Sequence, residues 1–318
     1  MSSTSCRDCP RGCAARGPQS FCGVDRPGRV YWRGVTLLEE HEIAPTYEVY
    51  FTGCSLRCRF CTVPDAIYAP RSGDWMPAEA LADDIARGDH PPFQTVSLVG
   101  GDPTVNLPYV RQLLPALRSR LPGVPLVLNT NLFVSPEHAR WYAATFDWIV
   151  GDVHFWEPAC AREVAAASGY PAAATRAAEA VLEAGGRLIL RILVLPGHLD
   201  CCAAPTAAWA ASLSGDLRIH VMTHYTPAGR AQGHPSLGRR LSDGEAARAA
   251  ALLPPEAPRP ATGPLRWSAG AGQDPPVPLE IDAAGRVVVP FVTASLLPLL
   301  TELEPEWGAR LSYLVEEG

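Results

Sequence analysis

The feature that most constrains the fold is a sixfold alternation of short apolar runs with amphipathic or alanine-rich runs, which begins at Tyr47. The apolar runs predict strands at 47–52, 95–100, 125–130, 147–153, 187–195 and 217–222. The runs between them predict helices near 77–87, 108–120, 136–145, 160–184 and 203–213. Strands rich in Val, Ile and Leu that alternate with helices are typical of a parallel sheet covered by helices. Six such units predict an α/β fold, a partial (β/α)6 TIM-like barrel.

The two ends of the chain fall outside this repeat. We expect a cysteine-rich N-terminal extension with a metal site over residues 1–46 and the barrel core over 47–226. Residues 227–318 are expected to form a Pro/Gly-rich linker and a C-terminal capping segment. Within that segment, PLEIDAAGRVVVPF predicts a small β-hairpin about a turn at DAAG, and TASLLPLLTELEPEW predicts a helix.

Composition and charge exclude several functional classes. A chain of 318 residues with 47% hydrophobic residues can bury a large core, and a net charge of −6 argues against nucleic acid as a partner. All 27 basic residues are arginine, which excludes lysine Schiff-base chemistry and lysine-held pyridoxal phosphate. The N-terminal run MSSTSCRDCPRG lacks the apolar core of a signal peptide, and the most apolar run, LILRILVL, is short and contains Arg191. We therefore expect a cytoplasmic protein without a membrane partner.

Seven of the ten cysteines lie within the first 61 residues, which in a reducing compartment indicates metal ligands and not a disulfide framework. Three of them, Cys54, Cys58 and Cys61, lie in the loop FTGCSLRCRFC. Structural zinc sites and iron–sulfur clusters usually take four protein ligands. Three thiolates leave one metal position open, where a second molecule could be chelated and reduced.

A second cysteine group stands nearer the N-terminus. Cys6, Cys9, Cys13 and Cys22 place four thiolates within seventeen residues, which could close a tetrahedral zinc site or hold a second iron–sulfur cluster. The spacing does not decide between these metals. The alternative interpretation is a redox-labile or disordered tail.

Polar motifs follow four of the predicted strands. GGDPT follows TVSLV, NTN follows PLVL, GDVH follows DWIV, and PGH follows RILVL. In α/β barrels the ligand lies at the carboxyl ends of the strands, so these motifs predict one site. Two adjacent glycines allow a close backbone approach, and the carboxylate of Asp102 could accept a hydrogen bond from an ammonium group.

The cysteine loop at the end of the first barrel strand, with Phe60 before its last cysteine and GGDP at the next strand end, resembles the radical S-adenosylmethionine (SAM) superfamily. The resemblance implies a [4Fe–4S] cluster held by Cys54, Cys58 and Cys61, with SAM bound through its amino and carboxylate groups to the fourth iron. An electron from a donor such as flavodoxin or ferredoxin would then cleave SAM to a 5′-deoxyadenosyl radical, which abstracts hydrogen from a C–H bond.

Residues 6–230 also resemble the subgroup named for pyruvate formate-lyase activating enzymes, in the order CPRGC, FCG, FTGCSLRCRFC, NTN, GDVH, RILVLPGH and YTPAGRA. Asp102 stands where the superfamily more commonly has Glu, and His154 stands where such enzymes have a lysine. The residues that the two resemblances imply for SAM binding are Phe60, Gly100, Gly101, Asp102, Pro103, Asn129, Thr130, Asn131, Asp152 and Arg191.

Three further side chains are candidates for catalysis. His154 could titrate near the reacting substrate, with packing or hydrogen bonding as the alternative. Cys201 and Cys202 could act as a hydrogen donor or thiyl carrier, although two small apolar fillers are the commoner interpretation of such a pair. Cys160 stands alone in the sequence and receives no function, and a loop histidine such as His198 is more often structural.

These features favour a radical SAM enzyme, an oxidoreductase in chemistry, that acts on a peptide or small-molecule substrate or on a protein. One alternative is an activase of a glycyl radical enzyme, but EIAPTYEVYFTGC and FCTVPD depart from the sequences of such activases around the cysteine loop. Another alternative, from a different class, is a non-catalytic iron–sulfur or zinc protein with a redox or metal-binding role.

Overall fold

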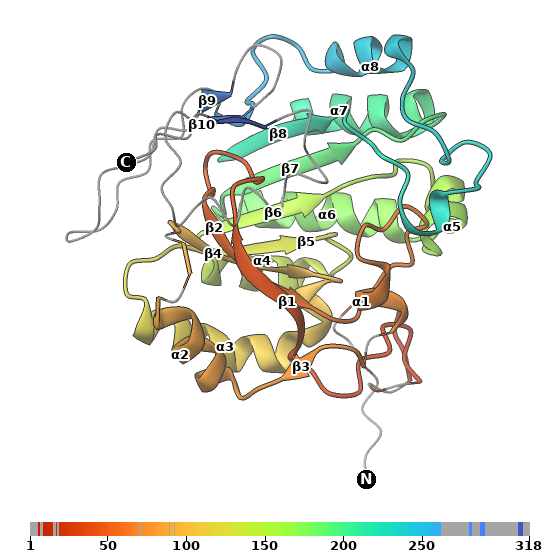
Figure 1. Cartoon of the computed structure of the whole chain (residues 1–318). Helices are drawn as coiled ribbons and strands as arrows, with labels where there is room; N and C mark the ends of the chain where they lie inside the picture. The colour runs from red at the N-terminus through yellow and green to blue at the C-terminus, as the bar shows by residue number, and fades with distance from the viewer. Residues whose placement is uncertain are drawn as a thin grey trace.

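A sheet of eight strands, in the order β3-β1-β2-β4-β5-β6-β7-β8, forms the framework of this computed structural model (Figure 1). The structure describes residues 6, 9–14, 17, 19–69, 71–88, 90–91, 93–261, 280–281, 287–289 and 311–313. The strands of this sheet are β1 (Arg29–Thr36), β2 (Thr46–Phe51), β3 (Asp74–Trp75), β4 (Thr95–Gly100), β5 (Leu126–Thr130), β6 (Trp148–Asp152), β7 (Leu188–Leu193) and β8 (Leu217–Met222).

The strands β2, β4, β5, β6, β7 and β8 are parallel neighbours and coincide with the six predicted strand runs. The sheet is not closed, because its two edge strands in the described part of the chain are β3 and β8. The predicted α/β architecture, a partial (β/α)6 barrel, is therefore confirmed.

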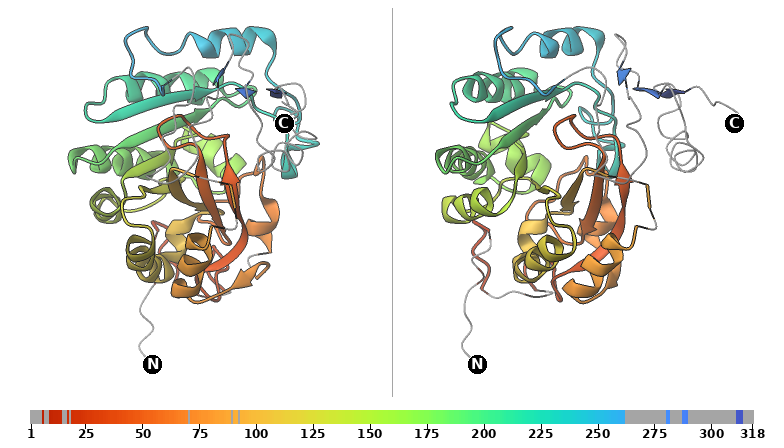
Figure 2. Two further views of the ribbon diagram at one scale, coloured as in Figure 1. Left: turned by 60° about the vertical axis from the view of Figure 1, so that its left-hand side comes forward. Right: turned by 90° about the vertical axis from the view of Figure 1, so that its left-hand side faces the viewer.

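Eight helices form in the described residues, and most of them connect parallel strands and cover the outer face of the sheet (Figure 2). They are α1 (Pro64–Tyr68), α2 (Ala78–Ala86), α3 (Leu107–Arg120), α4 (Pro136–Thr145), α5 (Pro158–Ala165), α6 (Tyr170–Glu183), α7 (Ala204–Ala211) and α8 (Asp243–Ala250). Short 3-10 turns form at Pro103–Asn106 and Gly229–Ala231, and a π-helical turn forms at Leu199–Ala203. Within the described residues, no helix combines the length and the apolar character that crossing a bilayer requires.

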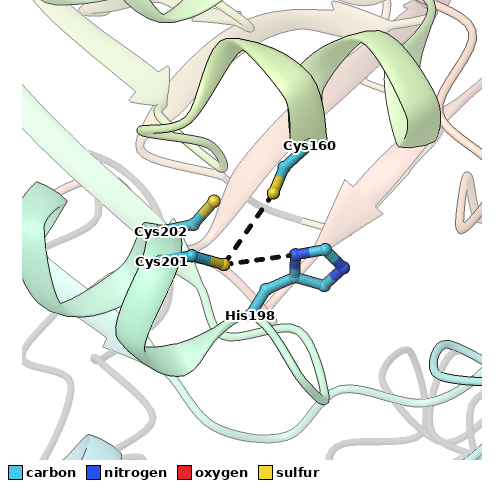
Figure 3. Close-up of side chains that lie close together, drawn as sticks. All are labelled: Cys160, His198, Cys201 and Cys202. Carbon is cyan, nitrogen blue, oxygen red and sulfur yellow. Dashed lines mark hydrogen bonds between the residues drawn. The ribbon is translucent and has the colours of Figure 1, made fainter.

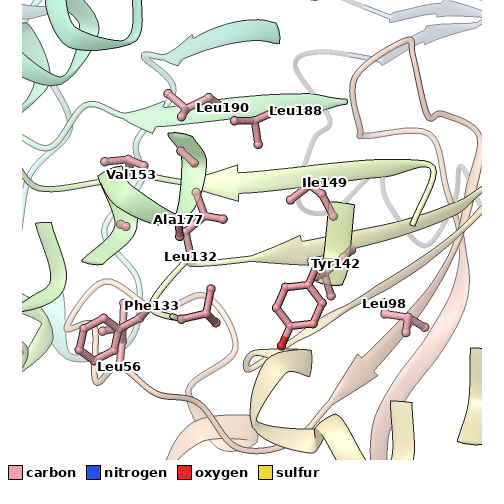
Figure 4. Packing of buried hydrophobic residues seen from close by; sticks show 14 of the residues in the cluster. Leu56, Leu98, Leu132, Phe133, Tyr142, Ile149, Val153, Ala177, Leu188 and Leu190 are labelled. Carbon is pink, nitrogen blue, oxygen red and sulfur yellow. The ribbon is translucent and has the colours of Figure 1, made fainter. Parts of the chain in front are cut away.

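Alternate strand residues supply the main hydrophobic core between the sheet and these helices (Figure 4). Because strand side chains alternate between two faces, Leu188 and Leu190 of β7 point to one face and Ile189 to the other. Leu188 and Leu190 belong to the same buried cluster as Tyr142 of α4 and Ala177 of α6. The outer face of the sheet is therefore the apolar face that packs against the helices.

The helix predicted over 160–184 is wrong, since the structure has two helices there, α5 and α6. Helix α5 ends at Ala165, because the next residue, Ala166, has a left-handed backbone with a φ of 56°. The last carbonyl groups of a helix have no partner within the helix. Here the carbonyls of Val164 and Ala165 accept hydrogen bonds from the backbone N–H groups of Arg59 and Arg57. Because α5 ends at this point, its last carbonyls are available to bind the cysteine loop.

The flanking regions contain structure that the sequence interpretation did not foresee. Residues 29–36, counted there with the extension, form β1, which pairs antiparallel with β2 from Thr36 opposite Thr46 to Val30 opposite Phe51. Helix α8 lies in the stretch expected to be a linker. Its start carries a capping box, in which Ser242 and Glu245 bond to each other's backbone N–H groups.

The predicted hairpin about DAAG corresponds to β9 (Glu280–Ile281) and β10 (Val287–Val289), which pair antiparallel. Strand β11 (Leu311–Tyr313) is parallel to β10. The helix predicted for TASLLPLLTELEPEW lies outside the described residues. The division of the chain into 1–46, 47–226 and 227–318, with a capping role for the last part, stays a prediction.

The connection between β1 and β2 fills the inner face of the open sheet. Ile43 from this connection packs in a separate buried cluster with side chains of β5, β6 and β7, namely Val127, Trp148, Val150 and Ile189. Glu40 from the same connection reaches the last two strands, since its Oε1 lies 2.8 Å from Nε of Arg191 and 2.7 Å from Nδ1 of His220. Glu39 also pairs with Arg191. The first hairpin therefore crosses the inner face to β7 and β8.

The pKa values of two buried carboxyl groups on the inner face of the sheet, Glu40 and Glu48, are shifted in opposite directions. Burial alone would raise the pKa of Glu40, but the charge of Arg191 and hydrogen bonds from Arg191 and His220 hold it well below its ordinary value. Burial and the neighbouring Glu39 carboxylate raise the pKa of Glu48 well above its ordinary value. Glu40 is therefore ionised at neutral pH, whereas Glu48 resists ionisation.

We expect Glu40→Gln to lower the free energy of unfolding at pH 7 by about 3 kcal/mol, because the change removes one of the two carboxylates that balance the buried Arg191 and leaves Glu39 alone to do so. The folded-state pKa of Glu40 is depressed, so its contribution is complete above the ordinary value of 4.5 and is lost as the pH falls below it. Urea unfolding at several pH values should show the difference between variant and wild type shrinking under acid conditions.

The matched variant is Glu48→Gln, the same change on the same inner face. The folded-state pKa of Glu48 is raised, so the wild type loses stability as the pH rises above the ordinary value of 4.5. Glutamine does not ionise, and this variant should be at least as stable as wild type at pH 7 to 8. Equal losses of stability in the two variants would contradict this account of the interior.

Candidate functional site

A cavity of about 840 Å³ lies at the carboxyl ends of the parallel strands. Parallel strands bring their carboxyl ends to one edge, which is why residues far apart in the sequence meet there. Most of the predicted site residues line it: Cys54, Cys58, Phe60, Cys61, Gly100, Gly101, Asn129, Thr130, Asn131, Asp152, His154 and Arg191. Asp102, Pro103, Cys201, Cys202 and the four N-terminal cysteines are not among the lining residues.

The cysteine loop is held in place by backbone hydrogen bonds near its start and in its middle. The N–H of Gly53 donates to the carbonyl of Ala66 at 2.7 Å, in the helix that follows the loop. The N–H groups of Arg57 and Arg59 donate to the carbonyls of Ala165 and Val164 at 3.0 and 2.9 Å. The loop therefore has fixed anchors although it forms no helix or strand itself.

Burial governs the three thiols of this loop. Burial is the main cause that raises the pKa of Cys61 to about 11 and the pKa values of Cys54 and Cys58 above their ordinary range. In such surroundings a thiol ionises when a metal supplies the compensating positive charge. Three soft sulfur ligands on one loop at the wall of one cavity fit the iron–sulfur cluster that the resemblance implies.

Asn131 connects the NTN segment to the cysteine loop. Its Nδ2 lies 3.5 Å from Sγ of Cys54 and donates to Oγ of Ser55 at 3.1 Å. The N–H of Leu56 also lies 3.3 Å from Sγ of Cys54. Hydrogen bonds to a ligating sulfur tune the reduction potential of an iron–sulfur cluster, so Asn131 is placed to influence a cluster held by Cys54.

The two glycines of GGDP are required by a close approach to the neighbouring strand and loop. Gly100 has a φ of 116°, and a Cβ there would lie 2.4 Å from the backbone N of Phe51. A Cβ at Gly101 would lie 2.1 Å from the carbonyl oxygen of Gly53. The N–H groups of Gly101 and Asp102 donate to Phe51 and Gly53, each at 2.8 Å, which fixes this segment to the start of the cysteine loop.

Asp102 is buried and its carboxylate is already occupied by donors of the protein. It accepts hydrogen bonds from the N–H of Thr104 at 2.9 Å, the N–H of Asn131 at 3.0 Å and the hydroxyl of Thr130 at 3.0 Å. Burial raises its pKa, and these hydrogen bonds oppose that effect. The carboxylate that the sequence assigns to an ammonium group therefore holds the NTN segment beside GGDP. Pro103 begins the 3-10 turn that follows.

His154 lines the cavity beside Phe60. The two rings meet edge to face with centroids 5.4 Å apart, and Nδ1 of His154 is buried without a hydrogen-bond partner in the described part of the chain. Burial and the charge of Arg191 lower the pKa of His154 below its ordinary value of 6.5, with Asp152 opposing them. The imidazole is therefore neutral at pH 7, whereas the lysine that activating enzymes have at this position would carry a positive charge.

Cys201 and Cys202 belong to a different group of side chains. The π-helical turn 199–203 places them with His198 and with Cys160 of α5, and the ligand atoms of all four lie within 4.8 Å of one another. Burial would raise the pKa of Cys202, but hydrogen bonds from His198 and from the backbone of Glu157 and Trp156 lower it. Sequence reasoning missed this group, although Cys160 and His198 follow strands that are neighbours in any (β/α)6 order.

The N-terminal cysteine segment docks on the cysteine loop. Arg11 lies between Cys9 and Cys13. Its Nε donates to the carbonyl of Ser55 at 2.6 Å, and its Nη2 donates to the carbonyl of Ala166 at 2.8 Å. The N–H of Cys6 donates to the carbonyl of Cys13 at 2.9 Å. Burial is the main cause that raises the pKa of Cys9 to about 11, and the other three cysteines add to it. Metal binding by this segment stays a prediction.

We expect Gly101→Ala to destabilise the protein by at least about 3 kcal/mol, the upper end of the cost of overpacking, because the clash is with backbone. Gly244→Ala is the matched control, since a Cβ there meets nothing within 4 Å and the glycine lies in helix α8. That change should stabilise by about 0.5–1 kcal/mol. Urea unfolding of both variants measures the difference, and similar values for the two would contradict the close approach.

Two known proteins match this chain in sequence over different lengths. The chain is 26% identical over 223 residues to the uncharacterized protein MJ0674 of Methanocaldococcus jannaschii, a match that covers 68% of this chain and 64% of the relative. It is 29% identical over 109 residues to 7-carboxy-7-deazaguanine synthase of Methanothermobacter thermautotrophicus, covering 34% of this chain and 41% of the synthase. The chain thus spans less than two thirds of either relative.

Among solved structures, SuiB of Streptococcus suis bound to the precursor peptide SuiA superposes with a TM-score of 0.48 at 14% identity, over 66% of this chain and 46% of SuiB. Coproporphyrinogen III oxidase (HemN) of Escherichia coli, a radical SAM enzyme, gives a TM-score of 0.37 at 14% identity, over 62% and 46%. The family model of the radical SAM superfamily matches residues 49–210 of the 318 residues. Because this match covers the cysteine loop, the GGDP motif and most of the barrel, the chain belongs to the radical SAM superfamily, whose enzymes use a [4Fe–4S] cluster and SAM.

Proposed function

We propose that this protein is a radical SAM enzyme that abstracts hydrogen from a peptide or small-molecule substrate bound in the cavity at the carboxyl ends of the strands. The observation that carries the proposal is the convergence of the three loop cysteines and of polar residues from neighbouring strand ends on one cavity of about 840 Å³. That volume lies in the range of ordinary ligand sites, which is roughly 300–1,000 Å³.

The cofactors supply the difficult step. Held by Cys54, Cys58 and Cys61, the reduced cluster together with SAM would supply one-electron cleavage of the C5′–S bond, which would give methionine and a 5′-deoxyadenosyl radical able to take a hydrogen atom from the substrate. The electron would come from a low-potential one-electron donor such as flavodoxin or ferredoxin. We assign the cluster to Cys54, Cys58 and Cys61 because all three line the cavity.

The polar lining residues are suited to hold SAM beside these cysteines. Asn129 and Thr130 present an amide and a hydroxyl, and Asp152 presents a carboxylate that can pair with an ammonium group. Arg191 lines the cavity while its charge is balanced by Glu39 and Glu40. We infer that Asp102 is a positioning residue, since its carboxylate contacts Thr130 and Asn131 and does not line the cavity.

His154 is suited to exchange a proton near the reacting atoms. It is neutral at pH 7, lines the cavity, and its Nδ1 has no hydrogen-bond partner among the described residues, so this nitrogen can accept a hydrogen bond from a bound group. The end of β8 and the loop after it contribute Met222, His224 and Tyr225, which the SAM assignment leaves unused. We assign this side of the cavity to the substrate.

The proposed substrate class draws on a relative and on the surroundings of the cysteine loop. The synthase relative is named for a small-molecule product, which supports the small-molecule alternative over activation of a glycyl radical enzyme. The activase alternative is weakened further by the departures of the chain around its cysteine loop. A non-catalytic metal-binding role is disfavoured by the polar strand ends that line the cavity.

The proposal predicts formation of 5′-deoxyadenosine when the anaerobically reconstituted, dithionite-reduced protein is incubated with SAM, and loss of this product in Cys58→Ala. Mass spectrometry of the mixture measures it. Ser97→Ala is the control, because Ser97 is also fully buried, loses one heavy atom in the change as cysteine does, and does not line the cavity.

The outcomes separate the alternatives. Product in wild type and in Ser97→Ala, but not in Cys58→Ala, supports the proposal, and a glycyl radical on an added partner protein would then favour the activase. A protein that binds neither cluster nor SAM through Cys54, Cys58 and Cys61 would overturn the proposal.

We also expect Asn131→Leu to lower the reduction potential of the cluster by roughly 20–40 mV. The lost hydrogen bond stabilises the extra negative charge of the reduced state, and about 0.5–1 kcal/mol corresponds to this range for one electron. A redox titration followed by electron paramagnetic resonance measures the shift. Asn129→Leu is the matched control, since Asn129 lines the same cavity but, among the described residues, only Asn131 brings a side-chain amide to the sulfur of Cys54. An equal shift of the potential in Asn129→Leu would contradict the role of Asn131.

A further inference from the structure

Four potential metal ligands converge outside the cavity (Figure 3). Cys160 comes from α5, which follows β6, while His198, Cys201 and Cys202 come from the loop and π-helical turn after β7. Sγ of Cys160 lies 3.8 Å from Sγ of Cys201, and Sγ of Cys201 lies 3.6 Å from Nδ1 of His198. The two segments therefore face each other through their sulfur and nitrogen atoms.

These distances match those of one tetrahedral ion. Zinc binds cysteine sulfur at about 2.3 Å and histidine nitrogen at about 2.0–2.1 Å, so tetrahedral angles place two sulfurs about 3.8 Å apart and a sulfur and a nitrogen about 3.6 Å apart. The ligand atoms of the four residues all lie within 4.8 Å of one another. A four-iron cluster bonds each thiolate to a different iron and holds its ligands farther apart, so this group fits a single ion better.

The surroundings are those of a closed site. Cys202 is buried, and the other three residues are half-buried. The rings of Trp156 and Trp209 lie 6.2 Å apart, and each belongs to a segment that carries ligands or adjoins them. Four protein ligands leave no open position, which is the pattern of structural zinc and not of catalytic zinc.

We propose that Cys160, His198, Cys201 and Cys202 form a structural Zn²⁺ site that fastens helix α5 to the turn after β7. Cysteine thiolates and imidazole are ligands suited to zinc, and a set of three cysteines with one histidine is among its usual closed sets. The site is separate from the cluster cysteines, because none of its four residues lines the cavity. It stands independently of the proposed radical chemistry.

The position of α5 gives this site a consequence for the cysteine loop. The carbonyls of Val164 and Ala165, at the other end of α5 from Cys160, accept the backbone hydrogen bonds of Arg59 and Arg57. The metal fixes the helix that in turn fixes the loop between Cys54 and Cys61. These four residues thus act on the cluster by position and are not catalytic residues.

The test is the metal content of the full-length protein purified anaerobically with zinc, measured by inductively coupled plasma mass spectrometry. We expect Cys160→Ala to lose one equivalent of zinc relative to wild type while its cysteine-loop iron is retained. His138→Ala serves as the control histidine change, because His138 lies on α4 and contributes to no ligand group among the described residues. Cys9→Ala separates any zinc held by the N-terminal cysteines, and its effect should add to that of Cys160→Ala.

Substitution with Co²⁺ in the Cys9→Ala background identifies the ligands without relying on stability. Three thiolates and one imidazole predict tetrahedral d–d absorption and a strong sulfur-to-cobalt charge-transfer band. His198→Cys should keep the ion and strengthen that band, since a set of four cysteines also closes a zinc site. Zinc content unchanged by Cys160→Ala, a spectrum without thiolate bands, or thiol titration showing Cys160 joined to Cys201 would each overturn the proposal.

Discussion

The interior of the protein depends on one interaction, the pairing of the buried Arg191 guanidinium with the carboxylates of Glu39 and Glu40. An open barrel leaves the inner face of its parallel strands uncovered, and here the connection between β1 and β2 covers it with Ile43, Glu39 and Glu40. Burying a cation costs on the order of several kcal/mol unless a carboxylate compensates it. The cation and the carboxylates therefore require each other, and this requirement fixes the first hairpin to β7. Because Arg191 also lines the cavity, the same pairing shapes the wall of the site.

The rest of the site is shaped by a close approach of two backbone segments and by two polar side chains. Gly101 lies so close to Gly53 that no side chain fits between them, and Asp102 uses its carboxylate to hold Asn131. Asn131 then reaches the sulfur of Cys54. Three segments that follow three neighbouring strands are thus connected in one chain of contacts. A change in any of them is expected to move a cysteine of the loop, although only the cysteines themselves would bind the cluster.

Sequence reasoning reached the six parallel strands and twelve of the residues that line the cavity, because motifs at the carboxyl ends of parallel strands lie at one edge of the sheet. It could not reach facts that depend on pairing. The strand β1 needs β2 as its partner, and the carboxylate of Asp102 reveals its protein donors only once Thr130 and Asn131 stand beside it. The capping box of α8 was readable at Ser242 and Glu245, but the surrounding prolines and glycines obscured it.

The group around Cys160 shows why position in the sequence misleads about metal ligands. Cys160 and Cys201 are forty-one residues apart, yet they follow β6 and β7, which pair along their length. Helix α5 has eight residues, and isolated helices shorter than about 12–15 residues are marginal in water. Its placement must therefore come from tertiary contacts, and its far end carries two of the anchors of the cysteine loop. The proposed zinc ion would supply one such contact, so the geometry of the cluster loop would depend on a second metal that takes no part in the reaction.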